Sequence, residues 1–252
     1  DSAALHAISP IDGRYRRHAE PLAAYFSEAG LIQYRIRVEV EYFIALHGLG
    51  LAQLPALTGA QVRGLRGLYI AFGESDAQEV KEIEKTTNHD VKAVEYYIKA
   101  RLEGLGLADR SEFVHFGLTS QDVNNTAIPL SMAEATADVL LPALQAARED
   151  LAALAEQWST VPMLARTHGQ PATPTTLGKE LAVFVFRLQR QLSRIDGQSF
   201  LGKFSGATGT YAAHLVAAPD VDWPEQSKGF VESLGLTHNP LTTQIESHDW
   251  QA

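Results

Sequence analysis

A histidine in a short polar segment is the first residue of this sequence that could do chemistry. His168 lies in the stretch Leu164-Ala-Arg-Thr-His-Gly-Gln-Pro-Ala-Thr-Pro174, which joins a titratable imidazole to hydrogen-bond donors and to the Gly and Pro residues typical of a loop. Catalytic residues tend to lie in loops held by a rigid scaffold. We therefore treat the segment as a candidate catalytic loop. The alternative is a helix–helix connector whose histidine only caps a helix end.

Three short polar segments form a second group of candidates, because each precedes a stretch with helical periodicity: 86–90, 119–122 and 173–176. Small polar side chains at such places satisfy free backbone N–H groups, and the positive end of a helix attracts anions. Two of these segments carry or adjoin a histidine, His89 and His168. Capping explains each segment alone, whereas all three together would make a cradle for a substrate with carboxylates or phosphate.

Near the N-terminus, a turn-like segment leads into a cluster of cationic side chains. The sequence Ser9-Pro-Ile-Asp-Gly-Arg-Tyr15 has the composition of a turn, and Arg16 and Arg17 follow it. Arginine matches the geometry of carboxylate and phosphate groups, so this arm could bring Arg14 to an anion. The alternative is a solvated terminal arm.

Composition excludes several classes of function. The 252 residues carry a net charge of −9, which argues against nucleic-acid binding. The chain has no Cys, which excludes disulfides and thiolate chemistry. The nine His show no His-x-x-x-His spacing, so we expect no metal site. There is no Gly-x-Ser-x-Gly motif of a serine hydrolase. No apolar run of about 18 residues and no signal-peptide pattern is seen. We expect a cytoplasmic protein that does not bind membranes.

Two long helices are expected on either side of the His168 segment. Apolar residues recur at spacings of three and four from Ala137 to Trp158 and from Leu177 to Ile195. Pro142 should kink the first of these helices. Thr173 and Pro174 are expected as the N-cap and the first residue of the second helix. The remaining helices are predicted at 60–72, 77–86, 91–102 and 225–235.

Residues 34–42 give two conflicting signals. Apolar and charged residues alternate along Tyr34-Arg-Ile-Arg-Val-Glu-Val-Glu-Tyr42, and period two favours a strand. Helical spacing is also present through Ile32, Ile36, Val40 and Phe43. Periodicity alone favours the strand.

Five motifs, in order along almost the whole chain, resemble the adenylosuccinate lyase family of the fumarase/aspartase superfamily. They are Asp12-Gly-Arg-Tyr15, Thr86-Thr-Asn-His-Asp-Val-Lys-Ala-Val-Glu-Tyr96, His115-Phe-Gly-Leu-Thr-Ser-Gln-Asp122, Arg166-Thr-His-Gly-Gln-Pro-Ala-Thr-Pro174 and Thr242-Thr-Gln-Ile-Glu246. The fourth motif is shared in part with argininosuccinate lyases. The second is more particular to the adenylosuccinate branch, and it favours that branch.

The resemblance implies an all-α fold. An N-terminal helical domain, 1–110, would precede the first part of a long-helix bundle, 111–252, with the bundle truncated at its C-terminus. Bundles from four subunits would form the core of a homotetramer with active sites shared between subunits. On the resemblance alone, residues 34–42 are assigned to a helix.

The resemblance also implies a reaction, the elimination of fumarate from adenylosuccinate to give AMP. The same enzyme family performs the parallel step on the succinyl-carboxamide ribotide in purine biosynthesis, with no metal and no organic cofactor. Such an elimination needs a base to remove the proton next to a carboxylate, an acid to protonate the leaving nitrogen, and donors for the developing charge.

Site residues follow from the same resemblance. His168 would be the general acid, and His89 would bind the substrate and assist. The other implied substrate-binding residues are Arg14 and Tyr15 at the phosphate end, Asn88 and Asp90 beside His89 in the nucleotide site, Thr119 and Ser120 at the succinyl carboxylate oxygens, and Gln244, which completes the pocket.

The sequence also departs from the family pattern. The loop with the catalytic serine base and the third domain would follow the point where this sequence ends, so we expect an N-terminal portion that is inactive alone. Gln121 replaces a common acidic residue and Ser247 a common proline. Two alternatives stay open: argininosuccinate lyase or another superfamily sibling, and a non-catalytic helical assembly module.

Overall fold

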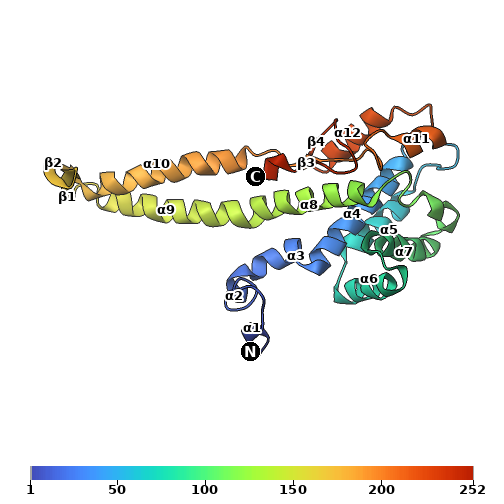
Figure 1. Ribbon diagram of the computed structural model, residues 1–252, viewed down its shortest axis with the longest axis horizontal. Coiled ribbons are helices and arrows are strands. Elements are labelled where there is room, and N and C mark those ends of the chain that lie inside the picture. The colour runs from blue at the N-terminus through green and yellow to red at the C-terminus, as the bar shows by residue number, and fades with distance from the viewer. Residues whose placement is uncertain (1, 252) are drawn as a thin grey trace. The chain divides into compact units, whose positions relative to one another are not determined.

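The computed structural model describes residues 2–251, and helices dominate it (Figure 1). The expected all-α class is confirmed. The chain forms two compact units, one made of the residues up to 133 together with those from 199 onward, and one made of 134–198. The predicted boundary after residue 110 lies within the first unit, because Val123 and Leu130 pack into the same core as Tyr34.

The first unit contains most of the helices. Its N-terminal part has α1 (Ser2–Leu5), α2 (Arg16–Ala19), η1 (Glu20–Leu22), α3 (Ala23–Phe26), α4 (Glu28–Leu46), α5 (Gly59–Ile70), α6 (Glu74–Thr87), α7 (Asp90–Leu102), η2 (Glu103–Leu105), η3 (Ala108–Phe113) and α8 (Ser120–Ala135), which ends in the second unit. Its C-terminal part has β3 (Leu201–Gly202), α11 (Ala212–Ala217), α12 (Trp223–Ser233), β4 (Thr237–His238) and η5 (Asp249–Gln251), with β3 and β4 paired in parallel.

Helix α4 is the central helix of the first unit, and both of its faces are buried. One stripe, Tyr34, Val38, Tyr42 and Leu46, packs in a cluster with residues of α8 and α12. The other stripe, Ile32, Ile36, Val40 and Phe43, packs with residues of α5, α6 and α7. Burial of one such aliphatic or aromatic side chain contributes about 1.5–3 kcal/mol. Through these two stripes, α6, α7 and α8 all pack against α4.

The strand that periodicity favoured at 34–42 is wrong, and the helix assigned by resemblance is confirmed. The charged residues Arg35 and Glu39 are buried, 5% and 0% exposed, because each has a polar partner from another element. The alternation of apolar and charged residues along 34–42 therefore reflects buried charged side chains in a helix, and not the solvent-facing side of a strand. The Ser27 hydroxyl accepts the Gly30 N–H at 3.1 Å and caps the helix start.

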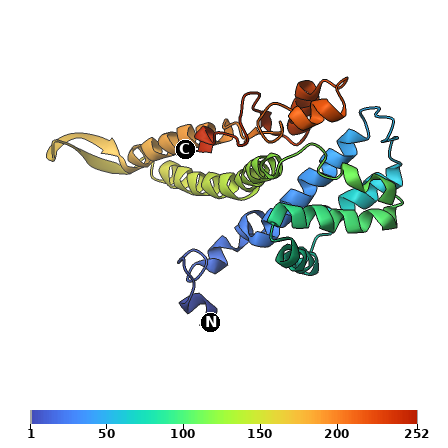
Figure 2. The same ribbon diagram turned by 45° about the vertical axis from the view of Figure 1, so that its right-hand side comes forward.

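The second unit is a pair of long helices joined by a β-hairpin. It contains the π-helical turn η4 (Thr136–Leu140), α9 (Leu141–Gln157), β1 (Pro162–Thr167), β2 (Gln170–Thr176) and α10 (Leu177–Asp196). Helices α9 and α10 lie side by side, and the hairpin extends beyond their ends (Figure 2). Strands β1 and β2 pair antiparallel from Pro162 opposite Thr176 to Thr167 opposite Gln170.

Two local predictions for this unit need correction. Thr173 and Pro174 lie in β2 and do not start the helix, because Pro174 pairs with Leu164 across the hairpin. The N-cap is Thr176, whose hydroxyl accepts the Lys179 N–H at 3.2 Å. Pro142 lies at the start of α9, directly after the π-helical turn. Its missing N–H removes the bond to residue 138, which accounts for the irregular turn there.

The helical run from Ser120 to Gln157 is long and apolar enough to cross a membrane by length and composition, with a mean hydropathy of 1.3 in a window that is 28% buried. No continuous apolar run marks this segment in the sequence. Its interspersed polar residues break any continuous run, while the mean over the window stays high. Core helices of soluble proteins pass the same test, so this finding alone assigns no membrane location.

Candidate functional site

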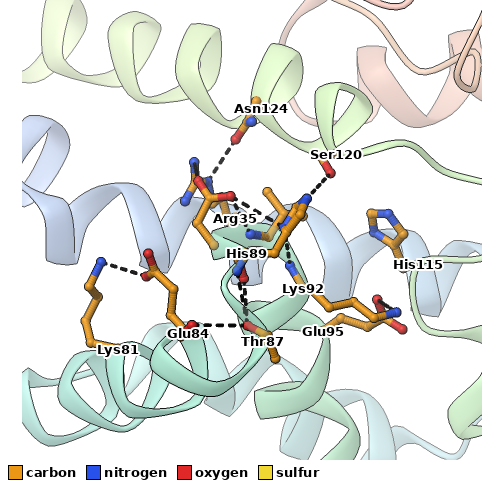
Figure 3. Close-up of polar contacts among 12 residues, drawn as sticks. Arg35, Lys81, Glu84, Thr87, His89, Lys92, Glu95, His115, Ser120 and Asn124 are labelled. Carbon is orange, nitrogen blue, oxygen red and sulfur yellow. Dashed lines mark hydrogen bonds and ion pairs between the residues drawn. The ribbon is translucent and has the colours of Figure 1, made fainter.

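Two of the predicted site residues meet in the first unit. His89 is the N-cap of α7, and its Nδ1 accepts the Lys92 N–H at 3.1 Å. Its Nε2 lies 3.3 Å from the Ser120 hydroxyl at the start of α8 (Figure 3). Because Nδ1 accepts, a neutral ring carries its proton on Nε2 and donates it to Ser120. The two helix starts thus present a histidine and a serine to the same place.

Asn88 and Asp90 flank this histidine in different roles. Asn88 adopts a left-handed conformation with φ 53° and ends α6, which lets the chain turn directly into α7. Asp90 accepts a hydrogen bond from Arg35 at 2.8 Å. Burial raises the pKa of Asp90, but the Arg35 charge and the Val91 N–H outweigh it and hold the pKa below its usual value. Asp90 is therefore a firmly ionised carboxylate.

A hollow of about 500 Å³ opens beside His89. Its lining residues are Glu28, Lys81, Glu84, Lys85, Asn88, His89 and Asp90. Lys81 bonds to Glu28 at 3.0 Å and to Glu84 at 2.6 Å, so its ammonium bridges α4 and α6. The volume is that of a small-molecule pocket, and the charged lining suits a polar ligand.

Thr119 and Ser120 are held in place by a buried carboxylate. Asp122 accepts the Thr119 N–H at 2.8 Å and the N–H groups of Ser205 and Gly206 at 2.9 and 3.1 Å. It also pairs with the Lys203 ammonium at 2.6 Å. Neither charged residue was expected from the sequence to support the site. Thr-x-x-Asp before a helical stretch was the available signal.

Gln244 is exposed, and its segment lies against the Gly-rich stretch that Asp122 holds. A Cβ on Gly209 would lie 2.1 Å from the Thr242 carbonyl oxygen, so only glycine allows this approach. Ser205 and Thr242 hydroxyls are 3.2 Å apart. The structure thus places the segment of Gln244 next to the 203–209 loop, and no hydrogen bond in the described part of the chain joins Gln244 to His89.

His115 is a further candidate, which was not among the site residues expected from the sequence. It precedes Ser120 on the same loop, adopts a left-handed conformation with φ 62°, and bonds to the buried Glu39 through Nδ1. Burial lowers the pKa of His115, but the charge and hydrogen bond of Glu39 outweigh it and raise the pKa above its usual value. Strained backbone and a shifted pKa are both common at functional sites. The histidine that opens the motif 115–122 was the available signal.

His168 lies at the tip of the β1–β2 hairpin in the second unit. His168 and Gly169 have φ values of 52° and 76°, as a two-residue type I′ turn requires. The Arg166 guanidinium donates to the Gly169 carbonyl at 3.3 Å and closes the turn. The imidazole is exposed and makes no hydrogen bond within residues 2–251. It is presented to solvent at the tip of a paired hairpin.

Arg14 and Tyr15 lie on the N-terminal arm of the first unit, away from any contact with His89. The Arg14 guanidinium stacks on the Tyr15 ring, 5.4 Å from its centroid, and both side chains are exposed. The structure therefore brings together His89, Asn88, Asp90 and Ser120, but it does not join the N-terminal pair to them. Across the described residues, no group of three His, Cys, Asp or Glu could hold a metal ion.

Comparison with known proteins assigns the chain to a family. Residues 13–252 match the family model described as "Lyase". The chain belongs to this lyase family. Among curated relatives of this lyase chain, proteins named adenylosuccinate lyase are 52% identical in Dictyostelium discoideum, 46% in Haemophilus influenzae and 44% in Escherichia coli. The alignments cover 97%, 98% and 99% of the chain but 54%, 54% and 55% of those proteins. The resemblance inferred from the five motifs is confirmed.

Solved structures support the lyase fold. A fumarate lyase from Mesorhizobium sp. BNC1 matches with a TM-score of 0.70 at 22% identity, over 92% of this chain and 51% of that one. A β-carboxy-cis,cis-muconate cycloisomerase from Acinetobacter calcoaceticus matches with a TM-score of 0.65 at 22% identity, over 88% and 50%. The lyase chain spans about half the length of the curated relatives that it matches.

Proposed function

We propose that the complete protein containing this chain eliminates fumarate from adenylosuccinate to give AMP, and performs the same elimination on the succinyl-carboxamide ribotide. The name shared by the relatives above supports this substrate. The observation that carries the proposal is the contact of His89 with Ser120 beside a charged hollow. It joins two motifs that lie 31 positions apart in the sequence.

The proposed chemistry divides the elimination among named groups. A base removes the proton next to a substrate carboxylate, the electron pair forms the double bond of fumarate, and the carbon–nitrogen bond breaks. His168 donates its proton to the departing nitrogen. Its exposed position at the tip of a hairpin suits a group that must reach a ligand.

The other groups bind and polarise the substrate. The hydroxyls of Thr119 and Ser120 donate to the succinyl carboxylate, where negative charge develops. On substrate binding, the Nε2–H of His89 turns from the Ser120 hydroxyl to the same ligand, and Asn88 and Asp90 line the nucleotide side. Arg14 and Tyr15 bind the phosphate end. Gln244 completes the pocket.

We further propose that four copies of the complete protein assemble with sites shared between subunits. Large apolar side chains are exposed on both helices of the second unit, and exposed apolar surface of this kind often marks a protein–protein interface. They are Leu154 on α9 and Val183, Phe184, Phe186 and Leu188 on α10. Packing of these helices against copies of themselves would bury this surface. A cytoplasmic location fits a role in purine biosynthesis.

No candidate for the base is assigned among residues 2–251, and we propose that another segment of the complete protein supplies it. Residues 1–252 alone are then expected to release no fumarate. Activity from this chain alone would show that the base lies within it.

The complete protein, supplied separately with adenylosuccinate and argininosuccinate, tests the substrate. Fumarate release from adenylosuccinate, with AMP formed in equal amount, is the expected result. Turnover of argininosuccinate alone would assign the chain to a sibling activity. No turnover of either substrate by a correctly assembled protein would favour a helical assembly module.

A further inference from the structure

A buried guanidinium links the two helix starts that meet at His89 and Ser120. Arg35, on the central helix α4, is 5% exposed. Its Nε donates to the Asn124 Oδ1 at 2.8 Å, and its terminal nitrogen donates to the Asp90 Oδ2 at 2.8 Å (Figure 3). One side chain thus holds a residue of α7 and a residue of α8.

These bonds complete a closed ring of contacts. Asp90 is the chain neighbour of His89, and Asn124 lies one helical turn after Ser120. The ring is closed by the His89 Nε2 and the Ser120 hydroxyl, 3.3 Å apart. Movement of either helix start would therefore change the Arg35 bonds and the His89–Ser120 distance together.

The shape of the guanidinium explains why an arginine occupies this position. Its donors lie in a rigid planar fork, so two acceptors on different helices are held at a fixed separation. A lysine ammonium is a point charge on a flexible stem and fixes no such separation. Arg35 does not line the hollow beside His89, so it acts through its neighbours.

We propose that Arg35 is a positioning residue that sets the distance between His89 and Ser120 for the elimination reaction. The inference rests on the proposed function. Without the fork, the starts of α7 and α8 separate, and the two donors no longer match one substrate geometry. Misplacement of about 1 Å can cost on the order of 10²-fold in rate. The loss should fall mainly on kcat, because Arg35 does not itself line the hollow.

Variants of the complete protein test this role, and the most direct ones change Asn124, the uncharged residue that accepts a hydrogen bond from Arg35. Asn124→Asp keeps an acceptor oxygen for Arg35, whereas Asn124→Leu removes it at similar volume. We expect Asn124→Leu and Arg35→Met to lower kcat on the order of 10²-fold, with a smaller change in KM. Arg35→Lys should fall between these variants and the parent, and Asn124→Asp should retain most of the rate.

Arg66→Met is the matched control. Arg66 also forms a two-point contact with α4, through both carboxylate oxygens of Glu41 at 2.8 and 2.9 Å, but away from His89. Its loss should leave kcat unchanged. If Arg35→Met and Asn124→Leu lower kcat no more than Arg66→Met does, or if Asn124→Asp is as slow as Asn124→Leu, Arg35 does not position the site.

A crystal structure of the Arg35→Met protein separates this inference from the proposed reaction. A His89–Ser120 separation beyond hydrogen-bonding distance is expected, and an unchanged separation would overturn the inference. If the parent protein releases no fumarate, the proposed function fails, and the structure of the variant still decides whether Arg35 sets this distance.

Discussion

Asp122 and Lys203 form a fully buried ion pair, with the Lys203 ammonium 2.6 Å from the Asp122 Oδ1 and both side chains 0% exposed. The two residues lie 81 positions apart in the sequence. The pair joins the start of α8 to the Gly-rich stretch 203–209, because Lys203 also donates to the Gly206 carbonyl at 2.6 Å. The arrangement of the Thr119–Ser120 segment therefore depends on a charge from the C-terminal part of the first unit.

Removal of one member of this pair should destabilise the fold strongly. Lys203→Met leaves the Asp122 carboxylate buried without its counter-charge, and such losses cost about 3–5 kcal/mol in the free energy of unfolding. Urea unfolding of the variant and the parent measures the difference. Lys179→Met is the control, because the exposed pair of Lys179 with Glu180 should contribute about 0–1 kcal/mol. Equal losses in both variants would contradict a structural role for the buried pair.

The pair of His115 with Glu39 predicts a loss of stability at high pH. Glu39 outweighs burial and raises the pKa of His115 in the folded state. The proton-linked stabilisation is thus fully present below the unfolded pKa of about 6.5 and is lost as pH rises through the folded value. Unfolding free energies measured from pH 6 upward should fall for the parent and fall less for His115→Gln. His6→Gln, at an exposed histidine, should follow the parent.

His214 predicts the opposite dependence at low pH. Burial lowers its pKa to about 4, and its Nε2 lies 3.1 Å from the Tyr42 hydroxyl, which donates to the Phe116 carbonyl. The neutral ring is therefore the folded form. Its contribution is present above pH 6.5 and is lost as pH falls toward 4, at up to roughly 1.4 kcal/mol per pH unit.

The measurement for His214 compares the pH slope of unfolding between 6.5 and 4.5 in the parent and in His214→Gln. Carboxylates titrate in both proteins, so the difference between the two slopes isolates the histidine. A slope that is the same in both would show that His214 can be protonated in the folded state without cost.

The helices could be predicted from the sequence where one face of the helix meets solvent. Helices α5, α6, α9 and α10 show apolar residues at spacings of three and four, and the structure places them near the expected bounds. Helix α4 could not be recognised this way, because its two opposite faces are buried and its charged residues Arg35 and Glu39 point inward to partners. Apolar periodicity in a sequence depends on one helix face being exposed to solvent, and α4 has almost no exposed face.

The sequence predicted which segments contribute to the candidate site, but not which of their residues contact one another. The polar residues at 86–90 and 119–122 marked two helix starts, and His89 and Ser120 do meet there. The supports of these starts lie far away in the sequence, as Asn124 does from Arg35, 89 positions apart. Single-sequence patterns carry no information on which distant residues pair.

The hairpin that carries His168 was missed for a local reason. Its strands contain three prolines, Pro162, Pro171 and Pro174, and lack the alternation of apolar and polar residues that marks a strand. Its two-residue turn uses His-Gly and not the common Asn-Gly or Asp-Gly. The histidine thus occupies a left-handed turn position that Asn or Asp fills more often.

This position gives a sharp test of His168 as the proposed general acid. His168→Asn keeps a residue that favours the left-handed turn, with φ 52° at this site, and removes the titratable group. Fumarate release by the complete protein should fall about 10²–10⁴-fold, while binding of AMP measured by calorimetry stays close to that of the parent. Gly169→Ala is the complementary control: it keeps the imidazole but strains the turn at φ 76°. If the proton donor matters more than the turn, Gly169→Ala retains more activity than His168→Asn; the reverse order would mean that the hairpin geometry, and not the imidazole, limits the reaction.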